Sequence, residues 1–123
     1  MHRVLVVEDE VAVGRALERL LRRWGAQVHM ISHPVDAPQL EGVLREQQPS
    51  VVLSDLMLHA ALDGVAVLKV ARRVVPMATR ALLSGSLFMV DEAMRREIDP
   101  CVYLAKPWDP HQLRLLLGPG GAA

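Results

Sequence analysis

The sequence has few of the features that mark membrane proteins, disulfide-rich secreted proteins or nucleic-acid-binding proteins. Among its 123 residues, aromatic side chains make up only 3%, there is one cysteine, and 14 Lys and Arg balance 14 Asp and Glu. A single cysteine excludes an internal disulfide and a four-cysteine zinc site, and it fits a reducing cytoplasm. A net charge of zero gives no reason to expect binding to nucleic acid or anionic lipid.

Long apolar runs are also absent. The most apolar stretch, residues 51–71, is interrupted by Asp, His and Lys side chains, so we expect no membrane span. The segment Met1–Glu8 has too short an apolar run for a signal peptide and lacks a small-residue cleavage site. We therefore expect a cytoplasmic protein with one compact domain, because this length leaves no room for a second core.

Hydrophobic residues, 51% of the chain, form five short runs separated by longer segments with helical spacing. The runs are Val4–Val7, Val28–Ile31, Val51–Leu53, Ala81–Leu83 and Val102–Leu104. Aliphatic runs of this length predict strands, and the segments between them predict helices. Strands joined by helices pair in parallel, with right-handed crossovers that place helices on both faces of the sheet. The sequence therefore predicts a doubly wound, five-stranded α/β domain.

Capping and turn residues predict where the helices begin and end. The clearest of these, in chain order, are Gly25, Asp36, Gly64, Pro76 and Asp109. A fourth helix is expected near Leu87–Arg96, and Gln112 is expected to complete a capping box with Asp109 at the start of the fifth. We expect the domain to cover residues 1–117, with 118–123 as a flexible tail or linker stub.

Polar side chains follow four of the five predicted strands at the points where the strands end. They are Glu8, Asp9 and Glu10 after the first strand, Asp55 after the third, Ser84 after the fourth and Lys106 after the fifth. Ligands of open parallel sheets bind outside the carboxyl ends of the strands, so we expect these groups to meet. Several carboxylates in one pocket repel one another without a cation, and oxygen ligands in that number suit Mg²⁺.

The remaining groups of this set suit phosphate. Lys106 supplies a positive charge and Ser84 a hydroxyl, and both groups bind anions. A carboxylate such as Asp55 can attack phosphorus directly and form an aspartyl phosphate. Each residue alone has an ordinary explanation as a helix cap, a first-turn charge or a surface lysine. Their joint occurrence at the ends of four strands favours the functional interpretation.

These residues give the sequence a resemblance to the receiver domains of two-component response regulators, from Arg3 to about Leu117. The matching segments are Val4–Glu10 for the first strand and acidic pair, Val51–Asp55 for the phosphoacceptor strand, Leu82–Gly85 for the hydroxyl-bearing segment and Tyr103–Pro107 for the last strand and its lysine. The resemblance implies a flavodoxin-like fold with sheet order 2-1-3-4-5.

The resemblance also implies how the site works. Asp55 would accept a phosphoryl group from a sensor histidine kinase or a phosphotransfer protein. Asp9 would bind Mg²⁺ directly and Glu8 would help through water, together with Asp55 and the backbone carbonyl of Met57. With this site, the domain would be a signalling switch of a phosphorelay, and not an enzyme with an external substrate.

The same resemblance implies a response to phosphorylation. Ser84 and Lys106 would bind the phosphoryl oxygens, and Tyr103 would turn inward as Ser84 moves toward them. The face formed by the fourth helix, the fifth strand and the fifth helix would then meet an output partner or a second copy of the chain.

One segment departs from the family pattern. After the acceptor the chain reads Met57–Gly64, with His59 in place of the usual proline and a loop about one residue longer. The change motivates a second hypothesis, a protein-interaction module of the same fold that no longer uses phosphorylation. A third, a phosphatase or nucleotide-binding protein on a related scaffold, is disfavoured because the sequence has no glycine-rich phosphate motif and no cap segment.

Overall fold

The computed structural model describes residues 2–33, 36–58 and 62–118, and the structural statements below refer to these residues. Its strands are β1 (Arg3–Val7), β2 (Gln27–Ile31), β3 (Val51–Asp55), β4 (Thr79–Ser84) and β5 (Val102–Ala105). All neighbouring strands are parallel, and their order is β2-β1-β3-β4-β5. The predicted doubly wound sheet and the strand order implied by the resemblance are both confirmed.

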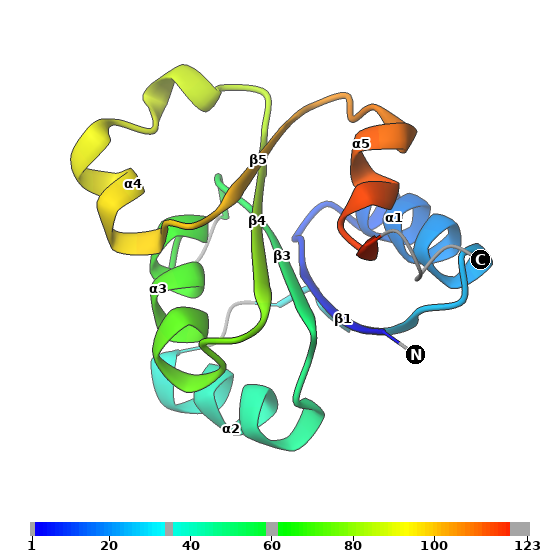
Figure 1. Cartoon of the computed structure of the whole chain (residues 1–123), viewed down its shortest axis with the longest axis horizontal. Coiled ribbons are helices and arrows are strands. Elements are labelled where there is room, and N and C mark those ends of the chain that lie inside the picture. The colour runs from blue at the N-terminus through cyan, green and yellow to red at the C-terminus, as the bar shows by residue number, and fades with distance from the viewer. Residues whose placement is uncertain (1, 34–35, 59–61, 119–123) are drawn as a thin grey trace.

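Helices cover both faces of this sheet. They are α1 (Val11–Arg23), α2 (Ala37–Gln47), α3 (Gly64–Val74), α4 (Glu92–Ile98) and α5 (Pro110–Leu115), with a short 3₁₀ turn, η1 (Leu87–Met89), before α4. Figure 1 shows α2, α3 and α4 on one side of the sheet and α1 and α5 on the other. Each side has its own buried aliphatic cluster, one beneath α2, α3 and α4 and one beneath α1 and α5. None of the described helices is long and apolar enough to cross a membrane.

Aspartates cap α2, α3, α4 and α5, whereas the N-cap of α1, Glu10, makes no side-chain capping bond. Asp36 and Gln39 form a reciprocal capping box at the start of α2. The capping box predicted for α5 is absent, because the carboxylate of Asp109 accepts a hydrogen bond from the nearer N–H of His111 at 2.9 Å. Gln112 instead lines a hollow between β5 and α5. Asp109 is nevertheless the N-cap that the sequence predicts.

The predicted fourth helix begins too early. Leu87–Met89 is a separate turn, and α4 begins only after Asp91, whose carboxylate accepts the N–H of Met94 at 2.8 Å. An N-cap residue has extended backbone, so Asp91 separates the two segments. Val90 is 5% exposed whereas Phe88 is 87% exposed. The apolar run at 87–90 therefore divides between the core and the surface.

A buried arginine that sequence reasoning missed ties α4 and β5 to the sheet. Arg80 in β4 is only 4% exposed. Its guanidinium donates to the carbonyl oxygens of Ile98 at 2.9 Å, Pro100 at 3.2 Å and Pro76 at 3.4 Å. Because Ile98 ends α4 and Pro100 precedes β5, Arg80 fixes the corner between them. An arginine directly before the apolar run Ala81–Leu83 is the signal that the sequence offers.

The register of the sheet sets the positions of the strand ends. Val7 of β1 is opposite Ser54 of β3, and Asp55 is opposite Leu83 of β4. Ser84 is in turn opposite Ala105 of β5. The residues that end or follow these four strands therefore come together at one edge of the sheet.

Candidate functional site

Three carboxylates meet at the carboxyl edge of the sheet. Glu8 and Asp9 follow β1, and Asp55 ends the adjacent strand β3. One oxygen from each carboxylate can be chosen so that all three lie within 4.8 Å of one another. Glu8 is 1% exposed and Asp55 is 5% exposed, while Asp9 is half-buried. The structure thus brings together the three side chains that the sequence predicts as metal ligands.

Lys106, which follows β5, contacts two of these carboxylates. Its Nζ lies 3.1 Å from Oε2 of Glu8 and 3.3 Å from Oδ1 of Asp55. The backbone N–H of Lys106 donates to the carbonyl oxygen of Ser84 at 3.0 Å, which holds the end of β5 against the end of β4. The lysine is therefore placed to neutralise charge at Asp55 and to contact a group bound there.

Burial and Lys106 act in opposite directions on the carboxyl groups of Glu8 and Asp55. Burial raises the pKa of Glu8 and of Asp55, and the hydrogen bonds and charge of Lys106 only partly oppose this rise. Burial by itself would lower the pKa of Lys106, but its contacts with Glu8 and Asp55 outweigh burial and raise it. The Lys106 ammonium thus contacts two of the three carboxyl groups of the cluster. A divalent cation fits such a set of oxygen donors, and the acidic cluster is compatible with Mg²⁺.

Ser84 and Met57 lie next to Asp55 in the structure. Ser84 is 2% exposed, and its Oγ accepts the N–H of Ser86 at 2.9 Å. The N–H of Met57 is hydrogen-bonded to the Asp55 carboxylate, while the Met57 side chain is 54% exposed. The carbonyl ligand expected from Met57 stays a prediction. The expected loop residue His59 lies outside the described residues, as do 60 and 61 and the tail residues 119–123.

Gly64 is a site residue whose importance sequence reasoning missed. A Cβ atom at this position would lie 2.1 Å from the carbonyl oxygen of Asp55 and 2.7 Å from Cα of Leu56. The N–H of Gly64 also donates to the carbonyl oxygen of Leu56 at 3.0 Å. The first residue of α3 therefore packs directly against the backbone of Asp55 and Leu56, and this contact leaves room only for glycine.

Tyr103 is turned away from the acidic cluster. Its hydroxyl donates to Oδ1 of Asp99 at 2.6 Å, and its ring is partly buried. Tyr103 lies within β5, and Lys106 directly follows this strand. The tyrosine is therefore on the strand that ends at the acidic cluster. The structure thus places the predicted switch residue in an outward position.

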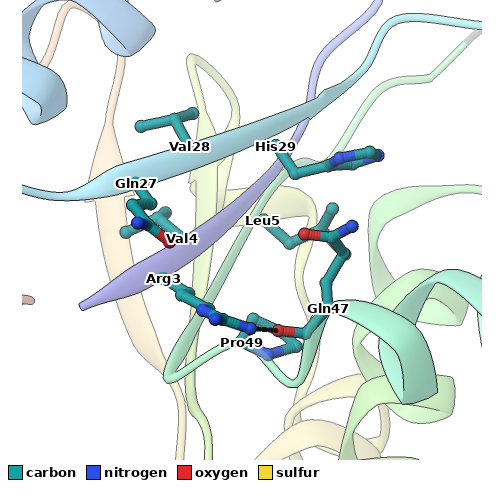
Figure 2. Close-up of a pocket in the computed structure, with 8 residues that line it drawn as sticks. All are labelled: Arg3, Val4, Leu5, Gln27, Val28, His29, Gln47 and Pro49. Atoms are coloured by element: carbon teal, nitrogen blue, oxygen red, sulfur yellow. Dashed lines mark hydrogen bonds between the residues drawn. The ribbon is translucent and has the colours of Figure 1, made fainter. Parts of the chain in front are cut away.

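A hollow of about 200 Å³ lies at the end of the sheet opposite the acidic cluster (Figure 2). Residues that begin β1 and β2 line it together with Gln47 and Pro49. No carboxylate lines this hollow, and its arginine, Arg3, already donates to the carbonyl oxygen of Gln47 at 3.2 Å. The carboxyl edge is therefore the better candidate for a functional site, as is general for open parallel sheets.

An open parallel sheet with an acidic cluster and a lysine at its carboxyl edge is an arrangement suited to binding a cation and an anionic ligand. The family model of the response regulator receiver domain matches residues 4–117. The chain therefore belongs to the family of response regulator receiver domains, which confirms the resemblance noted in the sequence. Its members are signalling domains of two-component systems.

Curated relatives and solved structures agree with this family. The transcriptional regulatory protein BaeR of Escherichia coli is 29% identical over 113 residues, which cover 90% of this chain and 44% of BaeR. The DNA-binding response regulator MtrA of Mycobacterium tuberculosis is 32% identical over 113 residues, which cover 90% of this chain and 46% of MtrA. The chain thus spans less than half the length of these two relatives.

Among solved structures, the chemotaxis protein CheY4 of Vibrio cholerae has a TM-score of 0.80 at 18% identity, covering 95% of this chain and 96% of CheY4. The signal receiver domain of an HD domain-containing protein of Pseudomonas fluorescens has a TM-score of 0.76 at 27% identity, covering 94% and 90%. At 18% identity, the similarity to CheY4 concerns the fold alone.

The raised pKa values predict how stability depends on pH. A carboxyl group whose pKa is higher in the folded chain than in the unfolded chain stabilises the fold below its ordinary value of about 4, and this stabilisation is lost as pH rises through the raised pKa. For Glu8 and Asp55 we therefore expect stability in EDTA to fall as the pH rises above about 4. Glu8→Gln should flatten this profile in urea denaturation.

Glu41→Gln is the control with the opposite sign. A hydrogen bond from Arg73 lowers the pKa of Glu41, so the Glu41 carboxylate stabilises the fold above its ordinary pKa and loses this effect on acidification. Glu41→Gln should therefore lower stability at neutral pH relative to acidic pH. A pH profile of Glu8→Gln with the same slope as wild type would contradict the electrostatic description of the cluster.

Proposed function

We propose that this chain is a phosphorylation switch in which Asp55 accepts a phosphoryl group from a phosphohistidine of a sensor kinase or phosphotransfer protein. The observation that carries the proposal is the cluster of Glu8, Asp9 and Asp55 with Lys106 in contact with the acceptor. Asp9 and Asp55 bind Mg²⁺ in this proposal, Glu8 helps through water, and the carbonyl of Met57 completes the protein ligands.

The transfer step follows from the positions of these groups. A carboxylate oxygen of Asp55 forms a bond to phosphorus while the phosphorus–nitrogen bond of the donor breaks. The donor imidazole keeps the electron pair and leaves neutral, because its other ring nitrogen carries a proton. Lys106 neutralises charge on the phosphoryl oxygens, and the hydroxyl of Ser84 donates a hydrogen bond to one of them. Mg²⁺, when bound, neutralises further charge on the transferred group.

The response to phosphorylation uses Ser84 and Tyr103. Ser84 moves toward the phosphoryl oxygens, and Tyr103 leaves its outward position and turns inward. Exposed apolar side chains near α4, β5 and α5 support this face as the output surface, since Phe88 is 87% exposed, Val102 38% and Leu115 62%. A hollow of about 450 Å³ lies between β5 and α5 on the same face.

We assign an output protein or a second copy of the chain to this surface. The domain itself has no net charge, which supports signalling through protein contacts and not through direct binding to nucleic acid or a membrane. A cytoplasmic location is part of the same proposal, because one unpaired cysteine, Cys101, fits a reducing compartment.

A small phosphodonor tests the proposal. Acetyl phosphate with Mg²⁺ is expected to give a base-labile adduct that mass spectrometry assigns to the peptide containing Asp55, and EDTA is expected to prevent it. Lys106→Met should slow adduct formation on the order of 100-fold, because a charge that stabilises the transferring group is lost. Lys69→Met is the matched control, since Lys69 is the other lysine of the chain and pairs with Glu97 on the surface.

The outcomes separate the two hypotheses for this fold. An adduct at Asp55 that depends on Mg²⁺ and on Lys106 supports the switch. The absence of an adduct with any small donor, together with unchanged tryptophan fluorescence on addition of Mg²⁺, would instead favour a receiver-like interaction module that does not use phosphorylation.

A further inference from the structure

Tyr103 is held in its outward position by two side chains. Its hydroxyl donates to the carboxylate of Asp99 at 2.6 Å, and the guanidinium carbon of Arg95 lies 4.1 Å from the centroid of its ring. The first contact is a short hydrogen bond to a charged acceptor, and the second is a cation–π contact. We call these three residues the Tyr103 latch. Both contacts belong to the outward position of the ring and are lost when the ring leaves it.

The acceptor of the latch is fixed by the backbone around it. The buried guanidinium of Arg80 donates to the carbonyl oxygens of Ile98 and Pro100, the residues on either side of Asp99. The N–H of Asp99 donates to the carbonyl oxygen of Arg95 at 2.7 Å. Because these bonds hold the corner between α4 and β5, Asp99 presents its carboxylate from a rigid position.

The other half of the latch is connected to the segment that follows Ser84. Nε of Arg95 donates to the carbonyl oxygen of Val90 at 3.4 Å, and the N–H of Val90 donates to the carbonyl oxygen of Leu87. At the start of this segment, Oγ of Ser84 accepts the N–H of Ser86. Hydrogen bonds thus connect Ser84 to the segment at 86–90 and this segment to Arg95.

We propose that Asp99 and Arg95 are positioning residues that hold Tyr103 outward in the resting domain and thereby set how readily the site at Asp55 drives the active conformation. This inference rests on the proposed function and adds its regulation. Contacts made only in the resting state oppose the change of conformation, so their removal raises the population of the active state. A ligand that prefers the active state then binds with higher apparent affinity.

The test uses a single labelled ring. Tyr103 is the only tyrosine of the chain, so tyrosine-selective isotope labelling gives one set of ring signals in NMR spectra. Beryllium fluoride with Mg²⁺ serves as a non-covalent phosphoryl mimic. In Asp99→Ala and Arg95→Met, the ring signal of the ligand-free protein is expected to move toward its position in mimic-saturated wild type. Apparent affinity for the mimic is expected to rise on the order of tenfold.

Arg96→Met is the matched control. Arg96 neighbours Arg95 on α4, is exposed, and its side chain pairs with Glu92. This variant should leave the ring signal and the affinity at wild-type values. Tyr103→Phe, which keeps the ring and loses the hydroxyl, should tighten mimic binding as Asp99→Ala does, and the double variant should add nothing further because both changes remove one bond.

Each outcome decides between the proposals. If Asp99→Ala and Arg95→Met leave both the ring signal and the affinity unchanged, the latch is overturned. If wild type fails to bind the mimic with Mg²⁺, the proposed phosphoryl site fails, while the ring signal of the ligand-free variants still decides whether Asp99 and Arg95 position Tyr103.

Discussion

Asp55→Asn is expected to abolish phosphoryl uptake from acetyl phosphate, with a loss of at least about 1,000-fold in the rate of adduct formation. The amide keeps the shape of the side chain but is a very poor nucleophile toward phosphorus, and it removes one negative charge from the proposed metal site. Because burial disfavours the Asp55 carboxylate in the absence of a cation, the same variant should be more stable than wild type at neutral pH in EDTA. Mass spectrometry and urea denaturation measure the two effects.

Asp63→Asn is the control for this prediction. Asp63 is exposed, close to the acceptor in sequence, and its carboxylate caps α3 by accepting the N–H of Ala66 at 2.8 Å. Asparagine caps helices about as well as aspartate, so this variant should keep both stability and phosphoryl uptake near wild-type values. Adduct formation that survives in Asp55→Asn and maps to another residue would overturn the assignment of the acceptor.

Gly64→Ala is expected to destabilise the domain by about 3 kcal/mol or more. The new Cβ would lie 2.1 Å from the carbonyl oxygen of Asp55, and a backbone atom cannot move aside as a flexible side chain can. Either the end of β3 or the start of α3 must shift, and both elements are buried there. Urea denaturation measures the loss, and phosphoryl uptake should fall even under conditions where the variant is folded.

The chain contains a matched glycine for comparison. Gly42 lies within α2, and a Cβ at this position meets no atom within 4 Å. Gly42→Ala should therefore stabilise the domain by about 0.5–1 kcal/mol, because alanine loses less backbone entropy than glycine in a helix. Equal changes in the free energy of unfolding for Gly64→Ala and Gly42→Ala would contradict a steric requirement for glycine at position 64.

The sequence was sufficient to predict the sheet and the meeting of the acidic residues. Five aliphatic runs separated by helical segments leave few topologies, and parallel strands bring their carboxyl ends to one edge. Glu8 and Asp55 could therefore be expected to meet although they are far apart along the chain. The predicted strands differ from the observed ones mainly by a residue or two at the ends, where hydrogen bonding continues beyond the apolar core.

Other features depend on contacts that periodicity does not encode. Gly64 could be predicted as a helix start, but not as the point where α3 touches the backbone of Asp55. The bonds from Arg80 to Ile98 and Pro100 join segments about 20 residues apart, and they depend on how α4 packs against the sheet. The apolar run at 87–90 predicts an earlier start for α4 than the structure shows, because Asp91 caps the helix and sets the boundary locally.

The site joins two parts of the domain that differ in how easily they open. All five residues of β3 are buried, and this strand is hydrogen-bonded to β1 on one side and to β4 on the other, so its amides exchange with solvent only when much of the domain unfolds. The turn at Leu87–Met89 contains no buried residue and belongs to the easily opened part. In the proposed switch, the acceptor aspartate is thus anchored in the part that opens least, and the rearrangement takes place where local opening costs little.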